Sequence, residues 1–234
     1  MSDADVDATL AKAAKAFSEW RMTSFEERSK ILNAFADALE ANKVDLAAGI
    51  TEEMGKPTTQ AIGEVEKSAF LCRHLAEHAE GYLSADTLNI NGDEVVIRPD
   101  PLGLLYSVTP WNFPVWQMVR FAAPAIAAGN TVVVKPAPNV IGVSNLVIET
   151  LAKVSPPGLY QALIIDHQQS DRVIADKRVA AVGLTGSERA GAAVASVAGQ
   201  NLKKVLLELG GSDPFIVLED ADIEKAAATG FFSC

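Results

Sequence analysis

Val108-Thr109-Pro110-Trp111-Asn112-Phe113-Pro114 is the stretch that decides the fold. It follows an apolar run over 102–108, interrupted by one glycine, that is typical of a buried strand, and it precedes a helical pattern over 115–128. A strand that ends in a rigid turn and restarts as a helix leaves polar groups at its carboxyl end, where open α/β sheets bind ligands. The Asn112 amide suits an oxyanion, although a loop asparagine bonded to its own backbone is favoured on this turn alone.

Strand and helix patterns alternate from residue 101 onward. We expect strands at 102–108, 131–135, 160–165, 179–184 and 203–207, and helices at 115–128, 140–153, 170–175 and 188–198. Continuous apolar strands separated by helices are typical of a parallel sheet that is covered on both faces. The sequence therefore predicts an α/β fold with a Rossmann-like, doubly wound parallel sheet, whose core spans residues 101–211.

The first third of the chain has helical patterns, and a hairpin follows it. We expect helices at 7–17, 25–39, 43–54 and 58–82. The third of these ends at Gly55-Lys56-Pro57, where glycine can cap the helix and proline forbids its continuation. Residues 87–98 alternate apolar and polar side chains about Asn91-Gly92, which predicts a hairpin with a tight primed turn. We expect a helical part over 1–86 and, over 87–100, a protruding hairpin that offers an edge to another subunit.

Composition limits the functional classes. The chain has 234 residues and a net charge of −10, which argues against nucleic acid or an anionic membrane as a partner. No apolar run is long enough to span a bilayer, and the first residues carry no signal-peptide pattern. Cys72 and Cys234 lie too far apart for a metal motif or a disulfide framework. Together these features predict a soluble, cytoplasmic protein.

Further strand ends carry candidate ligand-binding residues. Lys135 ends the second strand of the core, where it could bind a ribose hydroxyl or phosphate; a surface lysine fits equally well. Thr185-Gly186-Ser187 begins a helix, which suits a pyrophosphate, and a plain N-cap fits equally well. Glu208-Leu209-Gly210-Gly211 places a carboxylate after the last strand, where it could be a general base or a structural glutamate bonded to backbone amides. Parallel strands bring all these ends to the same rim as Asn112.

His74 and His78 share one helix and are four residues apart. A metal ion would need a third ligand, and no acidic partner is evident in the sequence. We therefore predict no metal site.

Four motifs together resemble the aldehyde dehydrogenase superfamily. They occur in the family's order and spacing, and the resemblance covers nearly the whole chain: Pro110-Trp111-Asn112-Phe113-Pro114, Lys135-Pro136, Thr185-Gly186-Ser187 and residues 207–214. Trp116-Gln117, the 210–216 segment and the short start of the chain look closest to bacterial succinate-semialdehyde dehydrogenases. The resemblance implies NAD(P)-dependent oxidation of an aldehyde, with succinate semialdehyde as the expected substrate. It also implies a homo-oligomer, since full-length relatives are dimers or tetramers, or a chain that is prone to aggregation when truncated.

The same resemblance implies roles in catalysis. Asn112 would donate to the thiohemiacetal oxyanion, and Glu208 would activate the hydrolytic water. Arg120 lies nine residues after Trp111, on the helix that follows the turn. Semialdehyde-oxidising relatives resemble this sequence there, with an arginine suited to a substrate carboxylate; a surface arginine is the equal alternative.

The cofactor implied by the resemblance is NAD or NADP. Lys135 would bind the adenine ribose, and Gly186 and Ser187 would bind the pyrophosphate. The resemblance also assigns the following residues to the cofactor, the first two as flanks of the nicotinamide: Thr185, Leu209, Thr109 and Trp111.

Three departures from the family pattern matter. Pro138 stands three residues after Lys135, where many NAD-using relatives have a glutamate, so we expect NADP to be accepted. The usual first hairpin of the family is absent. The family's cysteine nucleophile lies roughly 34 residues after the glutamate, past the end of this chain. Cys234 comes too early and lacks the preceding Gly-Gln, so we do not expect it to be catalytic.

The third departure sets an expectation for the whole chain. Residues 212–234 would begin a catalytic domain whose remainder is missing, and faces meant for that domain would expose apolar surface. We expect the chain to bind dinucleotide without turnover. A non-catalytic dinucleotide-binding or assembly module is the alternative function. A third possible function is that of a thioacylating relative, which uses coenzyme A instead of water. Glu208 argues against this function, because such relatives often lack the base that it would supply.

Overall fold

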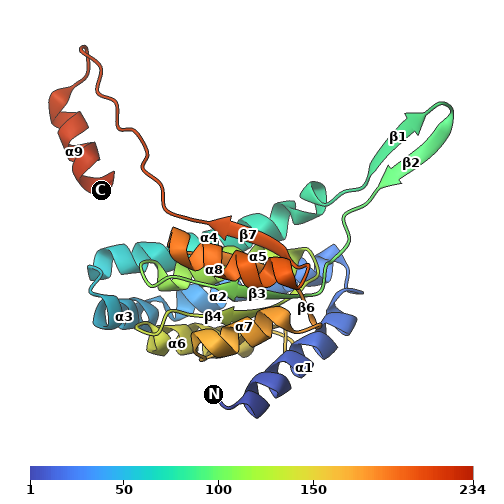
Figure 1. Ribbon diagram of the computed structural model, residues 1–234. Helices are drawn as coiled ribbons and strands as arrows, with labels where there is room; N and C mark the ends of the chain where they lie inside the picture. The colour runs from blue at the N-terminus through green and yellow to red at the C-terminus, as the bar shows by residue number, and fades with distance from the viewer. Residues whose placement is uncertain (234) are drawn as a thin grey trace.

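The computed structural model describes residues 1–233 and has the predicted α/β architecture (Figure 1). Helices come first: α1 (Asp3–Trp20), α2 (Phe25–Ala41), α3 (Lys43–Met54) and α4 (Thr58–Tyr82). The hairpin strands β1 (Asp86–Ile90) and β2 (Asp93–Ile97) follow. The remaining elements alternate: β3 (Leu104–Val108), α5 (Pro114–Ala127), β4 (Thr131–Lys135), α6 (Ile141–Ala152), β5 (Tyr160–Ala162), α7 (His167–Ala175), β6 (Val179–Thr185), α8 (Glu188–Gln200), β7 (Lys204–Glu208) and α9 (Ile223–Ser233). None of the helices among the described residues combines the length and hydropathy needed to cross a membrane.

A few element boundaries differ from the predicted ones. α1 begins at Asp3 rather than at residue 7, because Ser2 and Asp5 form a capping box. α7 begins at His167 rather than at residue 170, because Asp166 forms a second such box. β5 stops at residue 162 instead of 165, since only its first three residues pair with β4. α9 is not among the predicted helices.

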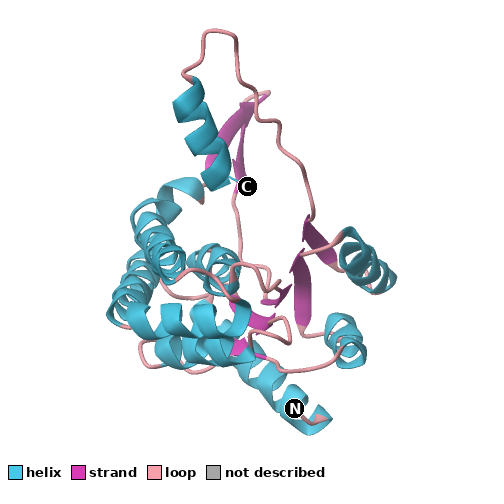
Figure 2. Ribbon diagram, turned by 90° about the vertical axis from the view of Figure 1, so that its left-hand side faces the viewer, coloured by secondary structure: helices cyan, strands magenta, loops and turns pink. Residues whose placement is uncertain are grey.

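The core is a parallel sheet between two layers of helices, as Figure 2 shows. Its strand order is β5-β4-β3-β6-β7, and every neighbouring pair is parallel. Successive side chains of a strand point to opposite faces, so Leu105 joins the apolar cluster formed with α2 to α6, whereas Leu104 and Tyr106 join the cluster formed with α1, α7 and α8. Both faces are therefore covered, which explains why the strands are continuously apolar.

The β1–β2 hairpin stands away from the sheet (Figures 1 and 2). Asn91 and Gly92 have φ angles of 55° and 95°, as a primed two-residue turn requires. Every residue of both strands is exposed, including the apolar side chains of Leu88, Ile90, Val95, Val96 and Ile97. The predicted protruding hairpin is confirmed.

The chain after β7 also leaves the body of the molecule (Figure 1). Among the described residues, β7 pairs only with β6, and its residues alternate between exposed and half-buried. Large apolar side chains are exposed along β7 and the segment beyond it: Leu206, Leu209, Phe215, Ile216, Val217, Leu218 and Phe231. This part of the molecule exposes the apolar surface that the sequence led us to expect.

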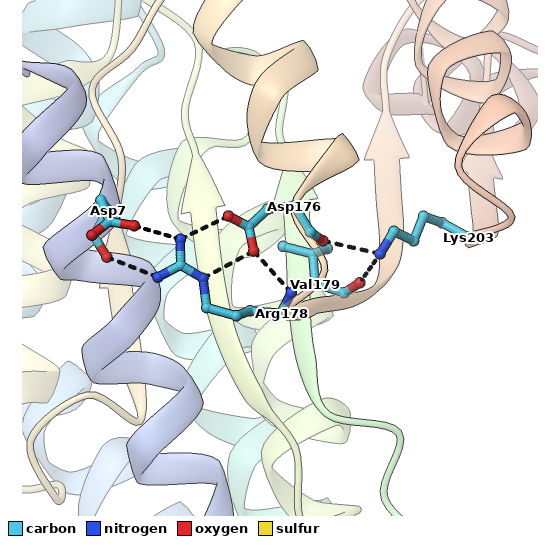
Figure 3. Close-up of polar contacts among 5 residues, drawn as sticks. All are labelled: Asp7, Asp176, Arg178, Val179 and Lys203. Atoms are coloured by element: carbon cyan, nitrogen blue, oxygen red, sulfur yellow. Dashed lines mark hydrogen bonds and ion pairs between the residues drawn. The ribbon is translucent and has the colours of Figure 1, made fainter.

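A polar network ties the N-terminal helix to the sheet (Figure 3). The guanidinium of Arg178 contacts Asp7 of α1 and Asp176, each at 2.7 Å. Lys203 donates to the carbonyls of Asp176 and Val179, at 2.9 and 2.7 Å. The hydrogen bonds from Arg178 hold the pKa of the Asp176 carboxyl below its usual range. The network thus joins α1 to the segments that precede β6 and β7.

Replacing Arg178 by Met should lower the free energy of unfolding at pH 7 by about 1–2 kcal/mol, because charge-assisted hydrogen bonds to two carboxylates are lost. The pKa of Asp176 is depressed in the folded state, so its contribution is present above about pH 4 and disappears as the pH falls through the folded pKa. Urea unfolding between pH 7 and pH 3 measures the difference between wild type and variant, which should shrink in acid.

Arg172→Met provides the control for this prediction. It removes the same charge, but the Arg172–Asp3 pair has side chains that are 59% and 66% exposed, so its loss should matter less. Equal losses in the two variants would contradict the assignment of the Arg178 network, as would a loss that does not change with pH.

Candidate functional site

The carboxyl ends of the central strands lie side by side at one rim of the sheet. Lys135 at the end of β4 pairs with Val108 of β3, and Val108 pairs on its other side with Leu184 of β6. Thr185 then pairs with Glu208 at the end of β7. The chain runs from β3 outward to β5 and then crosses back to β6, so a topological switch point lies beside β3, where open α/β sheets bind ligands. The predicted convergence of these strand ends is confirmed.

Lys135 is a largely buried lysine at this rim, and its ammonium nitrogen keeps some contact with solvent. Only 7% of the residue is exposed, so the alternative of a surface lysine is wrong. Its side chain has no hydrogen bond or ion pair with any residue that the structure describes. Burial lowers the pKa of its amine, and the charge of Asp166 acts in the opposite direction. A charge that is removed from water without a partner costs free energy. The N–H groups of the Lys135 ammonium could therefore donate to hydroxyl or phosphate oxygens of a ligand.

The N-terminus of α5 is occupied by a carboxylate from another helix. Phe113 precedes α5 and has no side chain that can cap it. Glu64 of α4 supplies the cap instead: one of its oxygens accepts from the amides of Val115 and Trp116, at 2.9 and 3.0 Å. The positive end of the α5 dipole is thereby neutralised within the chain.

Two more helix N-termini at the rim carry carboxylates. Glu53 of α3 accepts from the amides of Gly142 and Val143 in the first turn of α6, at 2.7 and 2.8 Å. Asp166 accepts from the amide of Gln169 in α7, at 2.8 Å. These first turns already hold an anion, so they are unsuited to binding a second one.

α8 begins differently. Ser187 caps it with a neutral hydroxyl, which accepts from the amide of Ala190 at 3.3 Å. Glu188 lies in the first turn, but its carboxylate bonds to none of the α8 amides. Among the helices that follow β3, β4, β5 and β6 in the described part of the chain, α8 alone has no carboxylate on its first-turn amides. It therefore offers its dipole to an anionic ligand.

The turn between β3 and α5 presents Asn112 and Trp111 at the surface. The side chain of Asn112 bonds to no described residue, so the interpretation in which it bonds its own backbone is wrong. Its two N–H donors remain available to an oxygen of a ligand. Thr109 is buried, and its amide donates to the carbonyl of Lys135 at 3.1 Å. This bond fastens the start of the turn to β4.

Arg120 and Glu208 form an ion pair, with 3.0 Å between guanidinium nitrogen and carboxylate oxygen. Their side chains are 40% and 46% exposed. The carboxylate of Glu208 thus contacts an arginine, and the alternative of a glutamate bonded to backbone amides is wrong. The pair borders a cavity of about 180 Å³ that is lined by Gln117, Arg120, Phe121, Gly183, Leu184, Thr185, Leu206 and Glu208.

Gly183 shapes one wall of this cavity. A Cβ atom at this position would lie 2.2 Å from the ring of Phe121, so a larger residue would displace the ring. Gly191 of α8 likewise gives room to Leu209, whose side chain would lie 2.6 Å from an added Cβ atom. These two glycines bring the ring against β6 and the leucine against the start of α8.

His74 and His78 lie on the exposed side of α4. Their rings stack with centroids 4.4 Å apart. One ring nitrogen of His74 lies 3.0 Å from the Tyr82 hydroxyl, and one of His78 lies 2.9 Å from the carbonyl of His74. Among residues 1–233, no group of three or more potential metal ligands is present.

The predicted site residues do not include Glu53, Lys56 and Glu64. Glu64 had a detectable signal, because helical spacing places it on the apolar face of α4 with Ala61 and Val65, where a charge is unexpected. In the sequence, Lys56 belongs to the stop signal after α3 and carries no further pattern. Its buried ion pair with Glu64 depends on how α3 and α4 pack, which no local pattern shows.

Comparison with known proteins identifies the family of the chain. Residues 1–234 match the Aldehyde dehydrogenase family, and the chain belongs to that family. The succinate semialdehyde dehydrogenase [NAD(P)+] Sad of Escherichia coli is 46% identical over 230 residues, which cover 97% of this chain and 50% of that protein. Succinate-semialdehyde dehydrogenase [NADP(+)] 1 of Mycobacterium tuberculosis is 43% identical over 232 residues, 97% of this chain and 51% of its own length.

A solved structure shows the same fold. Succinic semialdehyde dehydrogenase from Streptococcus pyogenes, in complex with NADP+, superposes with a TM-score of 0.96 at 36% identity. The match covers 100% of this chain and 52% of that one. The chain thus spans about half the length of the relatives it matches.

Lys135→Met should stabilise the ligand-free chain at pH 7 by on the order of 1 kcal/mol, because it removes a buried charge that has no partner. The pKa of the amine is lowered in the folded state, so the cost of burying it is full at neutral pH and vanishes as the pH rises above about 10. Urea unfolding at pH 7 and pH 10 measures this gain, which should be smaller at pH 10. Lys153→Met, at an exposed lysine, is the control and should change little; a loss of stability in Lys135→Met would show that the ammonium has a partner.

Proposed function

We propose that this chain is the dinucleotide-binding part of an NAD(P)-dependent aldehyde dehydrogenase that oxidises succinate semialdehyde to succinate. Lys135 carries this proposal, since this largely buried lysine lies at the switch point of a parallel sheet and its ammonium bonds to no described residue. Membership of the aldehyde dehydrogenase family and the names of the relatives support the reaction and the substrate.

The rim fits a dinucleotide. Lys135 would bind the hydroxyls of the adenine ribose. Gly186, Ser187 and the amides that begin α8 would bind the pyrophosphate, because α8 is the rim helix that carries no internal carboxylate on its amides among the described residues. When bound, the nicotinamide would supply the hydride acceptor. The remaining cofactor contacts would come from Thr109, Trp111, Thr185 and Leu209.

We infer that NADP is accepted as well as NAD. Pro138 stands where many NAD-using members of the family have a glutamate, so this position holds no charge that would repel a 2′-phosphate. The names of the Escherichia coli and Mycobacterium tuberculosis relatives include NADP, and the Streptococcus pyogenes structure contains it. Acceptance of NADP would thus depend on the loop between β4 and α6, which contains Pro138.

Three side chains at the rim would serve the aldehyde. The free amide of Asn112 would donate to the oxyanion that develops on the carbonyl oxygen. Glu208 would take a proton from the hydrolytic water. Arg120 would bind the carboxylate of the semialdehyde, which then takes the position that Glu208 has beside Arg120 in this structure. Substrate binding would thus release the base from its ion pair.

We assign no nucleophile to this chain. Cys72 is fully buried in α4, and burial raises the pKa of its thiol to about 12, so it is neither accessible nor ionised. Cys234 lies outside the described residues. We expect the reactive thiol to come from a catalytic domain that begins at 212–234, and residues 1–234 to bind dinucleotide without turnover.

We further propose that the β1–β2 hairpin contacts a second copy of the chain. Its strands expose apolar side chains on a ribbon that no other element covers in the described part of the molecule. A cytoplasmic location remains our expectation. It agrees with a free Cys72 and with the absence of a membrane-spanning helix among residues 1–233.

Calorimetric titration of the 234-residue chain should show binding of NADP and NAD, and Lys135→Met should weaken both by about tenfold or more because a charge-assisted bond to the ribose is lost. Lys153→Met should bind like wild type. The same preparation should form no NADPH from NADP and succinate semialdehyde. Failure of both dinucleotides to bind would overturn the proposed function, and clear turnover would overturn our view of the nucleophile.

A further inference from the structure

Behind the turn that carries Asn112 lies a buried ion pair. Lys56 follows the Gly55 cap of α3, and Glu64 lies in α4. Their side chains are 7% and 1% exposed, and the ammonium bonds directly to one carboxylate oxygen, Oε2. Burying two charges costs several kcal/mol of desolvation, so the pair is poor evidence of stabilisation by itself. Its contacts with the turn suggest another purpose.

Both oxygens of Glu64 are used. Oε1 accepts from the amides of Val115 and Trp116, and Oε2 accepts from Lys56. These two amides belong to the second and third residues of α5, and they are its first N–H donors because Pro114 has none. A charged acceptor on these amides, at the positive end of a helix dipole, fixes the first turn of α5 against α4.

Lys56 holds the residue next to Asn112. Its ammonium lies 3.5 Å from the centre of the Phe113 ring, close enough for a strong cation–π contact. Phe113 as a whole is 43% exposed. Lys56 therefore binds the carboxylate that caps α5 and, at the same time, the aromatic ring that precedes α5.

We propose that Lys56 and Glu64 are positioning residues that set the direction of the Asn112 amide. The side chain of Asn112 bonds to no described residue, so the backbone of its turn must determine where its donors point. Glu64 and Lys56 restrain that backbone from the α5 side, through the first-turn amides and the Phe113 ring. This inference rests on the proposed function, in which Asn112 stabilises an oxyanion that tolerates little displacement of its donor.

Glu53 offers a matched control. It caps α6 through the amides of Gly142 and Val143, as Glu64 caps α5. Each carboxylate replaces a missing side-chain cap on the helix that it serves. α6 follows β4, however, and does not carry the Asn112 turn. Glu53→Gln therefore removes a similar cap without touching the turn.

The first experiment measures amide hydrogen exchange by NMR in the 234-residue chain. Glu64→Gln should accelerate exchange at Val115 and Trp116 by about tenfold or more, because a neutral amide oxygen is a weaker acceptor than a carboxylate. Exchange at Gly142 and Val143 should stay unchanged. Glu53→Gln should give the reverse pattern. If the amides of Val115 and Trp116 exchange as in wild type after Glu64→Gln, the proposed restraint is wrong.

The second experiment measures kinetics in an aldehyde-oxidising polypeptide that includes residues 1–234. Glu64→Gln should lower kcat about tenfold or more and leave KM for the aldehyde nearly unchanged, since a misdirected oxyanion donor affects the transition state. Glu53→Gln should keep the kcat of wild type. A Glu64→Gln variant that loses no more kcat than Glu53→Gln would assign the pair a structural role alone and overturn the proposal.

The double variant K56M/E64Q guards against misfolding. It removes both charges together, so neither is left buried without its partner. It should fold and show the same loss of kcat as Glu64→Gln; a kcat equal to that of wild type would contradict the proposal. If wild type neither binds dinucleotide nor oxidises an aldehyde, the proposed function fails. The exchange pattern then still decides whether the pair restrains the turn.

Discussion

The rim depends on one constraint, a largely buried lysine at the end of a central strand whose ammonium has no acceptor among the described residues. Lys135 cannot withdraw from the rim, because β4 is hydrogen-bonded to β3 on one side and to β5 on the other. The charge of Asp166 acts on it, but no described residue bonds to it. Such a costly arrangement is typical of positions where a ligand completes the bonding. The rim is therefore better suited to a ligand than to the stability of the free chain.

The chain directs an anionic ligand by filling the alternative positions. Every helix that begins at the rim presents a positive dipole end. Glu64, Glu53 and Asp166 occupy the first turns of α5, α6 and α7, and among the described residues Ser187 gives α8 a neutral cap. We propose a second role for Glu64, since its carboxylate binds the first-turn amides of the helix that follows the Asn112 turn. In the proposed function, the distribution of internal carboxylates would decide where the dinucleotide binds and how Asn112 is directed.

The convergence of strand ends could be predicted from the sequence, because it follows from parallel strands and needs no knowledge of side-chain packing. Local signals likewise located the hairpin and most helices. The ion pairs Arg120–Glu208 and Lys56–Glu64 could not be predicted, since each joins elements whose packing is set by the whole fold. The lack of a partner for Lys135 is equally invisible in the sequence, because it is a property of the complete surroundings. The electrostatics of the rim are therefore set mainly by tertiary contacts.

A crystal structure of the chain with NADP would test the account most directly. We predict that the pyrophosphate lies on the first-turn amides of α8 and that the ammonium of Lys135 lies within about 3.2 Å of an oxygen of the adenine ribose or its phosphate. The carboxylates of Glu64 and Glu53 should keep their bonds to α5 and α6. A pyrophosphate on α5 or α6 with either carboxylate displaced, or a Lys135 that remains without a ligand contact, would contradict the account.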